Sequence, residues 1–491
     1  MATIDVIDPL TGSKLHEIES HSATDVALRF LEASKAQVGW GKTSPKERAR
    51  IASRIADELI QKQEELMDIL QRETGKSRAH AFEEVTGALG AIAYYAKITP
   101  KTMRRKKVKA GVPFLLSAYV EPAPVGVVGV ITPWNYPLAL TMMDVIPALM
   151  AGNAVVQKAD NQTALTVQLA REIAVSAGVP AEVWTVVHGE PAEVGNAVTD
   201  NADYVAFTGS TPTGKLVAQR AASRLIGYSL ELGGKNPMII LPGSDLEKAA
   251  EAAIGGAFGN SGQLCVSIER LYVPNHALPE FEQILKRRVE TLTVGSSNEF
   301  DFDLGALSSS NQLERVSTFV ERAVIEGARL VTGGKVLAEI GPNFYAPTVL
   351  SDIPQGAEIL HKEVFGPVIA LVGYNSLDEA VELANATEFG LNAAVFGNRK
   401  QGIEIASRLM AGSVNVNEGY RASMASMAAP MGGMKQSGMG RRSGVNGLLR
   451  FTESRTIGVA NDSPIGLPTR AKQYRKMAPL MTKLARLMGK L

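Results

Sequence analysis

Residues 125–137 read VGVVGVITPWNYP, an apolar run followed by a loop with two prolines. The run is rich in Val and alternates little between polar and apolar residues, which is typical of a strand covered on both faces. Similar runs follow at AVVQK (154–158), VWTVVHG (183–189), YVAFTG (204–209) and YSLELGG (228–234). Helical patterns separate them at 162–177, 191–199 and 212–223. Strands that alternate with helices predict βαβ units and a parallel sheet, with a nucleotide bound at the carboxyl ends of the strands.

The chain continues on both sides of this region. Upstream, Ser44-Pro45-Lys46-Glu47 combines a capping box with Pro at the first helical position, so the N-terminal part is expected to be helical. Downstream, residues 235–430 hold a second α/β stretch, with helices expected at 246–258 and 311–326 and strands at PMIIL, RLYV, VIALVG, AAVFG and SVNV. A chain of 491 residues with two such stretches is predicted to form at least two domains.

Composition excludes several classes of protein. Lys and Arg number 51 against 50 Asp and Glu, without the cationic excess of a nucleic-acid binder. No apolar run approaches the length of a membrane span, and the start MATIDVIDPLTG lacks the features of a signal peptide. The single cysteine permits no intrachain disulfide, which fits a reducing compartment. We therefore expect a cytoplasmic protein that spans no membrane and binds no nucleic acid.

Cys265, the only cysteine, is the first candidate for catalysis. A lone buried Cys is usually a small apolar filler. Here it follows the small residues Gly259-Asn260-Ser261-Gly262, which give a substrate close access and would not occur in an apolar core strand. This context favours a nucleophilic thiol.

Two further residues have the chemistry to assist a thiol. Glu231, in LELGGK (230–235), is a carboxylate at the end of an apolar strand, where burial would raise its pKa and suit a general base. The alternative is a plain ion pair with a lysine such as Lys235. Asn135 lies between the prolines of TPWNYP (132–137), which fix the direction of its amide, so it could stabilise an oxyanion. The alternative is an ordinary turn Asn.

Candidate phosphate contacts follow two of the strands. Lys158 ends AVVQK, where a cation could reach a ribose or phosphate. Gly209 and Gly214 bracket Ser210-Thr-Pro-Thr, a turn that leads into a helix N-terminus with free N–H groups. The dinucleotide fingerprint G-x-G-x-x-G follows none of the expected strands. No cluster of His and Cys has the spacing of metal ligands, so no metal site is expected.

Taken in order along the chain, these motifs resemble the aldehyde dehydrogenase superfamily. The principal matches are ITPWNYP (131–137), FTGS (207–210), LELGGKNP (230–237), GQLC (262–265) and EVFGP (363–367). Further matches are Glu73-Thr-Gly-Lys76, FYAPTVL (344–350), GLNAAVFG (390–397) and GGMKQSGMGR (432–441). The resemblance covers roughly residues 5–460. The family's nucleotide domain also lacks the usual glycine fingerprint, which accounts for its absence here.

The resemblance implies an α/β fold with two parallel-sheet domains and a small β oligomerisation hairpin. A Rossmann-like NAD(P)-binding domain would take residues 1–100 and 123–231, and a catalytic domain residues 232–430. Oligomerisation elements would lie at 101–122 and 431–460, joining copies into homodimers or homotetramers. Residues 461–491 form a basic tail with a short amphipathic helix, expected to fray or pack on another subunit, with membrane-surface contact as the alternative.

The family's roles fall on named residues of this chain. Cys265 would attack the aldehyde, Asn135 and the Cys265 N–H would hold the oxyanion, and Glu231 would activate the water that releases the acid. NAD(P)⁺ would accept the hydride. The implied cofactor contacts are Thr132, Pro133, Trp134, Lys158, Asn161, Gly209, Ser210, Gly214, Leu232, Glu363 and Phe365.

Within the superfamily, SVNVNEGY (413–420) resembles the substrate loop of the succinate-semialdehyde dehydrogenases. Two arginines that would hold the distal carboxylate are replaced by Gly259 and Met143. Arg421 is a candidate replacement, and Tyr136 is a second candidate for substrate contact. The alternatives are a broad dehydrogenase of apolar or aromatic aldehydes and, outside the enzymes, a non-catalytic family member.

Asn161 bears on the choice of cofactor. It stands where NAD⁺-selective members have a Glu whose carboxylate binds the adenosine ribose. A carboxylate would repel a 2′-phosphate, whereas an amide can donate to it. NADP⁺ is therefore the expected cofactor, with NAD⁺ also accepted. Asp160, if it turned inward, could take over the role of the missing Glu.

Overall fold

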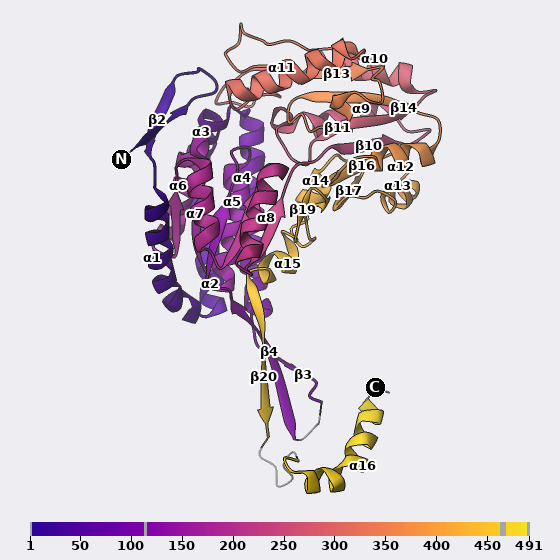
Figure 1. The fold of residues 1–491 in the computed structure, drawn as a ribbon. Helices are drawn as coiled ribbons and strands as arrows, with labels where there is room; N and C mark the ends of the chain where they lie inside the picture. The colour runs from indigo at the N-terminus through magenta and orange to yellow at the C-terminus, as the bar shows by residue number, and fades with distance from the viewer. Residues whose placement is uncertain (1, 112–114, 462–467, 489–491) are drawn as a thin grey trace.

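The computed structural model describes residues 2–111, 115–461 and 468–488. Figure 1 shows two α/β bodies side by side, one built mainly from the N-terminal half and the other from the C-terminal half. A thin antiparallel arm extends away from the first body, and the last helix, α16 (Ala471–Met488), lies apart from both bodies.

The first body contains a six-stranded sheet in the order β19-β9-β8-β5-β6-β7. Its five longer strands are parallel and occupy the predicted positions: β5 (Val127–Ile131), β6 (Ala154–Lys158), β7 (Trp184–Val187), β8 (Tyr204–Thr208) and β9 (Gly227–Glu231). The edge strand β19 (Gly438–Met439) runs antiparallel to β9, so the sheet is mixed rather than wholly parallel. This short strand returns from the C-terminal region, and two residues show no periodicity from which it could be predicted.

Helices complete this body. Four connect or follow the sheet strands: α5 (Pro137–Ala151), α6 (Ala164–Ser176), α7 (Pro191–Asn201) and α8 (Thr211–Ser223). Four more precede the sheet: α1 (Ala23–Lys42), α2 (Pro45–Gln61), α3 (Gln63–Thr74) and α4 (Arg78–Thr102). Ser44 caps α2 as predicted, because its hydroxyl accepts the Glu47 N–H at 3.2 Å. The chain nevertheless begins with a hairpin, β1 (Thr3–Ile7) and β2 (Lys14–Glu19), rather than a helix.

The second body contains a seven-stranded sheet in the order β12-β13-β14-β11-β10-β16-β17. The predicted strands are β10 (Asn236–Ile240), β11 (Ile268–Pro274), β14 (Val368–Tyr374), β16 (Asn392–Phe396) and β17 (Ser413–Val416). Two more extend one edge, β13 (Thr348–Ser351) in parallel and β12 (Arg329–Thr332) antiparallel, so this sheet is also mixed. Its helices are α9 (Leu246–Ala257), α10 (Leu278–Val289), α11 (Ser310–Ile325), α12 (Leu377–Asn385) and α13 (Arg399–Ala406).

Small elements join the parts. Short helical turns are η1 (Asn161–Thr163), η2 (Gly259–Gly262), η3 (Glu358–Leu360), α14 (Arg421–Met424) and α15 (Gly444–Leu449). The strands β15 (Phe389–Gly390) and β18 (Met434–Lys435) form an antiparallel pair. The arm is a three-stranded sheet in which β4 (Leu116–Pro124) lies between β3 (Lys106–Val108) and β20 (Thr452–Ala460). The strand β20 thus pairs with β4 of the same chain.

The C-terminal tail is helical over a longer stretch than expected. Residues 462–467 and 489–491 of the predicted tail lie outside the described residues. Within the described part of the chain, none of the helices combines the length and apolar character that a membrane span requires.

Candidate active site

A cavity of about 230 Å³ lies where the carboxyl ends of β8 and β9 meet the second body. Most of the predicted site residues line it: Pro133, Trp134, Asn135, Gly209, Ser210, Glu231, Leu232, Cys265, Glu363 and Phe365. Leu140, Thr208, Gly233, Gln312 and Arg315 complete the lining. Since these residues span the chain from 133 to 365, the fold brings the predicted nucleophile, base and amide into one space.

A strained turn presents Cys265 to the cavity. Asn260 and Ser261 adopt left-handed backbone angles, with φ of 50° and 54°, and Gly262 follows with φ of 73°. A Cβ on Gly262 would lie 2.0 Å from the Gly366 carbonyl oxygen, so only glycine fits there. Residues other than glycine keep left-handed backbone angles only where surrounding contacts hold them in place. Two such contacts are the Asn260 amide, which donates to the Asn135 carbonyl at 3.1 Å, and the Ser261 hydroxyl, which donates to the Gly305 carbonyl at 2.9 Å.

The Cys265 thiol is held in its protonated form. Burial raises its pKa to about 12, and the nearby carboxyl groups of Glu363 and Glu231 add to the shift. The backbone is fixed by Asn236, whose amide donates to the Cys265 carbonyl at 2.8 Å. Since the thiolate is the nucleophilic form, this cysteine requires a neighbouring base.

Glu231 has the properties of such a base. It is only 3% exposed, and neither carboxylate oxygen has a hydrogen-bond partner among the described residues. Burial raises the pKa of this carboxyl to about 7, so it can exchange a proton near neutral pH. The alternative of an ion pair with Lys235 is wrong, because Lys235 pairs with Glu269 instead.

The return segment that contains β19 positions the Glu231 end of β9. The Glu231 carbonyl accepts the Gly209 N–H at 3.1 Å, and the Leu232 N–H donates to the Ser437 carbonyl at 3.0 Å. The Ser437 hydroxyl also donates to the Gly233 carbonyl at 2.7 Å. The strand end that carries Glu231 is therefore held from both sides.

Asn135 is fixed on its predicted loop and is 4% exposed. Its side-chain amide donates one hydrogen bond, to the Gln263 carbonyl at 3.0 Å. An amide nitrogen carries two N–H groups, so a second donor is available in the cavity wall. Its backbone carbonyl accepts from the Lys76 ammonium at 2.9 Å. This arrangement suits an oxyanion donor better than a simple turn residue.

The cofactor side of the cavity has an aromatic end and a helix N-terminus. The rings of Trp134 and Phe365 meet edge to face, with centroids 5.6 Å apart. Glu363 accepts the Gly234 N–H at 2.7 Å, and burial raises the pKa of its carboxyl to about 7. Ser210 caps α8, whose first turn begins beside the cavity. A flat ring, a ribose acceptor and a helix N-terminus fit a dinucleotide.

Several predicted cofactor residues do not line this cavity. Thr132 accepts a bond from Gln157 at 2.9 Å. Lys158 ends β6, and burial lowers the pKa of its ammonium. A Cβ on Gly214 would lie 2.5 Å from a methyl group of Leu232, so Gly214 lets that residue approach.

Asn161 also differs from the expectation. Its amide nitrogen donates to the Gly189 carbonyl at 3.0 Å, and its amide oxygen accepts the Gly189 N–H at 3.1 Å. The side chain thus ties two loops together, and only the second N–H of its amide can serve as the donor that the sequence suggested.

Tyr136, the second candidate for substrate contact, lies beside Cys265 in an apolar cluster. Tyr136, Met143 and Tyr420 belong to this cluster, and Cys265 packs against it. A Cβ on Gly259 would lie 2.6 Å from the Tyr420 hydroxyl, so Tyr420 occupies the space beside the replaced arginine position.

Arg421 stands outside the cavity lining and already has acidic partners. Its guanidinium lies 3.2 Å from the Glu83 carboxylate and 3.7 Å from that of Glu418. It also stacks on the Tyr420 ring at 5.0 Å.

Three supporting residues escaped the sequence analysis. Glu269 accepts the Val364 and Phe365 N–H groups, and Gln312 donates to the Phe365 carbonyl at 2.7 Å, which together fix the EVFGP loop. Arg442 is buried and donates to Asp144 at 2.6 Å and to the Thr208 hydroxyl at 2.6 Å. The sequence signal for Arg442 was its place directly after GGMKQSGMGR, a run that the family shares.

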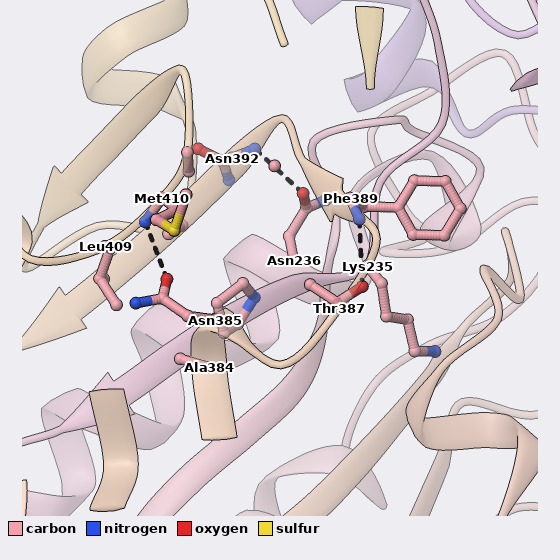
Figure 2. Close-up of a pocket in the computed structure, with 13 residues that line it drawn as sticks. Lys235, Asn236, Ala384, Asn385, Thr387, Phe389, Asn392, Leu409 and Met410 are labelled. Atoms are coloured by element: carbon pink, nitrogen blue, oxygen red, sulfur yellow. Dashed lines mark hydrogen bonds between the residues drawn. The ribbon is translucent and has the colours of Figure 1, made fainter. Parts of the chain in front are cut away.

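A much smaller cavity of about 10 Å³ lies beside β10, and Cys265 does not line it. Figure 2 shows that its polar groups bond to one another. The Asn392 N–H donates to the Asn236 side chain at 3.0 Å, and the Met410 N–H donates to Asn385 at 2.8 Å. This region supports Asn236, which holds Cys265, and offers no reactive group. Among the described residues, no His, Cys, Asp and Glu cluster could bind a metal ion.

Comparisons with known proteins agree with this geometry. The aldehyde dehydrogenase family matches residues 1–457. A Mycobacterium ulcerans protein named "putative succinate-semialdehyde dehydrogenase 2", with NADP(+) as its named cofactor, is 44% identical over 99% of this chain and 95% of its own. A Mycolicibacterium smegmatis protein of similar name is 43% identical over 98% of this chain and 94% of its own.

Solved structures show the same fold. A structure described as an E. coli NADP-dependent enzyme has a TM-score of 0.90 and 32% identity, covering 94% of this chain and 95% of that one. A Staphylococcus aureus betaine aldehyde dehydrogenase in complex with NAD⁺ has a TM-score of 0.90 and 30% identity, covering 94% and 92%. With the matched family model and the relatives in agreement, this chain belongs to the aldehyde dehydrogenase family.

Proposed function

We propose that this protein oxidises an aldehyde to its carboxylic acid with NADP⁺ as the preferred acceptor, NAD⁺ also being accepted. The observation that carries the proposal is the cavity that holds Cys265, Glu231 and Asn135 together, with both Glu231 oxygens unbonded among the described residues. A non-catalytic family member would not need a buried carboxylate with a pKa near 7 beside a half-buried thiol.

The chain's own groups account for the steps around the thiol. Glu231 accepts the Cys265 proton, and the thiolate adds to the aldehyde carbon to form a hemithioacetal. The second N–H of the Asn135 amide and the Cys265 backbone N–H donate to the oxyanion. When bound, NAD(P)⁺ supplies the hydride acceptor. Glu231 releases the Cys265 proton to solvent and then removes a proton from the water that attacks the Cys265 thioester. It passes this second proton to the departing Cys265 thiolate, which releases the acid and restores the thiol.

The two bodies divide these tasks. The first, with Trp134 and Ser210, would hold the cofactor, and the second would supply Cys265 together with Glu363 and Phe365 against the nicotinamide ribose and ring. The names of the mycobacterial relatives and the uncharged Asn161 support NADP⁺. Asn161 contributes the absence of a repelling carboxylate, the second N–H of its amide and, through its bonds to Gly189, the position of the loop after Lys158.

Succinate semialdehyde is the substrate that we propose first. The names of relatives that align over nearly the whole chain support it. Arg421 is the candidate cation for the distal carboxylate, although Glu83 and Glu418 now offset its charge. A substrate carboxylate would have to compete with these two side chains.

A second substrate class has an observation in its favour. The cluster against which Cys265 packs consists of Met, Leu, Val, Ala and Tyr side chains, including Met143 where an arginine was expected. Such a surface would bind an apolar or aromatic aldehyde without the cost of desolvating a carboxylate.

The experiment compares kcat/KM for succinate semialdehyde, butanal and benzaldehyde with each cofactor. We expect succinate semialdehyde with NADP⁺ to be the best pair. A charge-assisted bond contributes roughly 1.5–3 kcal/mol, so Arg421→Ala should raise KM for succinate semialdehyde about tenfold and change butanal little. Arg408→Ala, which removes a surface arginine paired with Asp378, is the matched control. A wild-type preference for butanal or benzaldehyde would establish the second class instead.

A further inference from the structure

Lys76 is a buried cation that the proposed chemistry does not use. It follows α3 after Gly75, which ends that helix with φ of 76°. Its side chain is 0% exposed and makes an ion pair with Glu84 of α4, also 0% exposed. The Lys76 ammonium donates to the Asn135 carbonyl at 2.9 Å and lies 4.3 Å from the centre of the Tyr136 ring. It therefore contacts the two residues at the end of the loop before α5.

Glu84 holds the next turn of the same segment. Its carboxylate accepts the Leu138 N–H at 2.7 Å and the Ala139 N–H at 3.2 Å. These are the first free N–H groups of α5, whose own N-cap residue, Tyr136, makes no side-chain cap bond. A carboxylate at a helix N-terminus accepts hydrogen bonds from N–H groups that have no partner within the helix. Its negative charge is also attracted to the positive end of the helix dipole. One ion pair thus fixes the carbonyl of Asn135 and the start of the helix that follows it.

Stability alone does not account for this pair. Burying two charges is costly, and replacing a buried ion pair with apolar side chains is often neutral or stabilising. Apolar side chains could not donate to the Asn135 carbonyl or accept two helical N–H groups. The two charges fix the backbone at Asn135 and so orient its side-chain amide, which must point at the oxyanion to lower the barrier.

We propose that Lys76 and Glu84 are positioning residues that aim the Asn135 amide at the oxyanion. The inference rests on the proposed function, because it assigns no chemistry to the pair itself. Its effect falls on kcat, since the oxyanion forms only during reaction. Because the hydrogen bonds of this pair reach Asn135 and the start of α5 but not Trp134, NADPH binding should be unaffected.

A double-mutant cycle tests this inference with Lys76→Met, Asn135→Ala and their combination. Single-turnover rates with enzyme in excess keep even slow variants measurable. We expect Lys76→Met to slow the parent at least tenfold and the Asn135→Ala variant less than twofold, because its effect passes through Asn135. The dissociation constant of NADPH should stay within twofold of the parent value. Equal losses in both backgrounds, or a matching loss of NADPH affinity, would overturn the inference.

Two further variants keep the test decisive. Lys76→Met combined with Glu84→Gln removes both charges while the new amide oxygen can still accept the helical N–H groups, so this variant replaces Lys76→Met if the single change does not fold. Lys235→Met disturbs another buried Lys–Glu pair, which holds the EVFGP loop, and its effect should be the same in both Asn135 backgrounds. If Asn135→Ala alone reacts at the parent rate, the oxyanion assignment of the proposed function fails. If Asn135→Ala is slow, and Lys76→Met slows it by the same factor as it slows the parent, only the positioning role fails.

Discussion

Glu231 is a buried carboxyl whose placement serves chemistry at the expense of stability. In the folded chain its pKa rises from 4.5 to about 7, so the folded state keeps this proton over a range in which the unfolded state has lost it. The stability that the protonated group contributes is complete below pH 4.5 and is lost as the pH rises through about 7. At one pKa unit per 1.36 kcal/mol, the loss is about 3 kcal/mol.

A Glu231→Gln variant should therefore gain stability relative to the parent as the pH rises. Gln carries no charge, so it lacks the penalty that the parent incurs above pH 7. We expect the difference in Tm, variant minus parent, to be about 2 °C larger at pH 8.5 than at pH 5.5. Glu299→Gln, at an exposed glutamate, controls for the general effect of one charge. A Tm difference that does not change with pH would show that Glu231 is not strained by ionisation.

The sequence predicted which residues form the site better than it predicted the contacts that each of them makes. Cys265, Glu231 and Asn135 were found because each has an unusual local context, such as a carboxylate in an apolar strand end. The bonds of Asn161 to Gly189 could not be predicted, because they join two loops that follow different strands. Lys76 and Glu84 were missed for the same reason: what makes them relevant is a contact with Asn135, 59 residues from Lys76 in sequence.

The turn before Cys265 is the element that most depends on its residue types. Gly262 has φ of 73° and no room for a Cβ, whereas Gly243 has φ of 74° and no atom within 4 Å of the same position. Both changes to Ala place a side chain in the left-handed region, at roughly 1–2 kcal/mol. Only Gly262→Ala adds a clash with the backbone of Gly366.

We therefore expect Gly262→Ala to lower the free energy of unfolding by at least about 2 kcal/mol more than Gly243→Ala, and to reduce kcat as well. Urea unfolding and initial rates measure the two effects. Similar losses for the two variants would mean that the turn adjusts without moving the loop that carries Cys265.

The elements that were predicted correctly share a strong local pattern. β6 has the predicted limits because AVVQK is an apolar run between helical segments. β19 and β12 were not predicted, since a two-residue strand and a half-exposed edge strand depend on a neighbour for their pairing. They make both sheets mixed, and β19 helps to fix the strand end that carries Glu231.

The arm and α16 extend away from the two α/β bodies (Figure 1). We propose that the arm joins copies of the chain, because β3 and β20 leave sheet edges on either side of β4. Light scattering after size exclusion should then report a dimer or tetramer. A monomer at micromolar concentration would remove this proposal.

Truncation after Asn461 should leave kcat/KM unchanged within about twofold, because α16 contributes no residue to the cavity lining. Steady-state rates of the truncated and full-length chains measure this directly. A loss of kcat at unchanged oligomeric state would show instead that α16 reaches the site of another copy.

The central claim is that Cys265 forms a thioester that Glu231 then hydrolyses. The most direct measurement mixes Glu231→Gln with aldehyde and NADP⁺, follows NADPH absorbance, and determines the mass of the quenched Cys265 peptide. We predict a burst of NADPH about equal to the enzyme concentration, slow turnover afterwards, and the mass of the acyl group on Cys265. Turnover of Glu231→Gln at the parent rate, with Cys265 unmodified, would contradict the thioester mechanism.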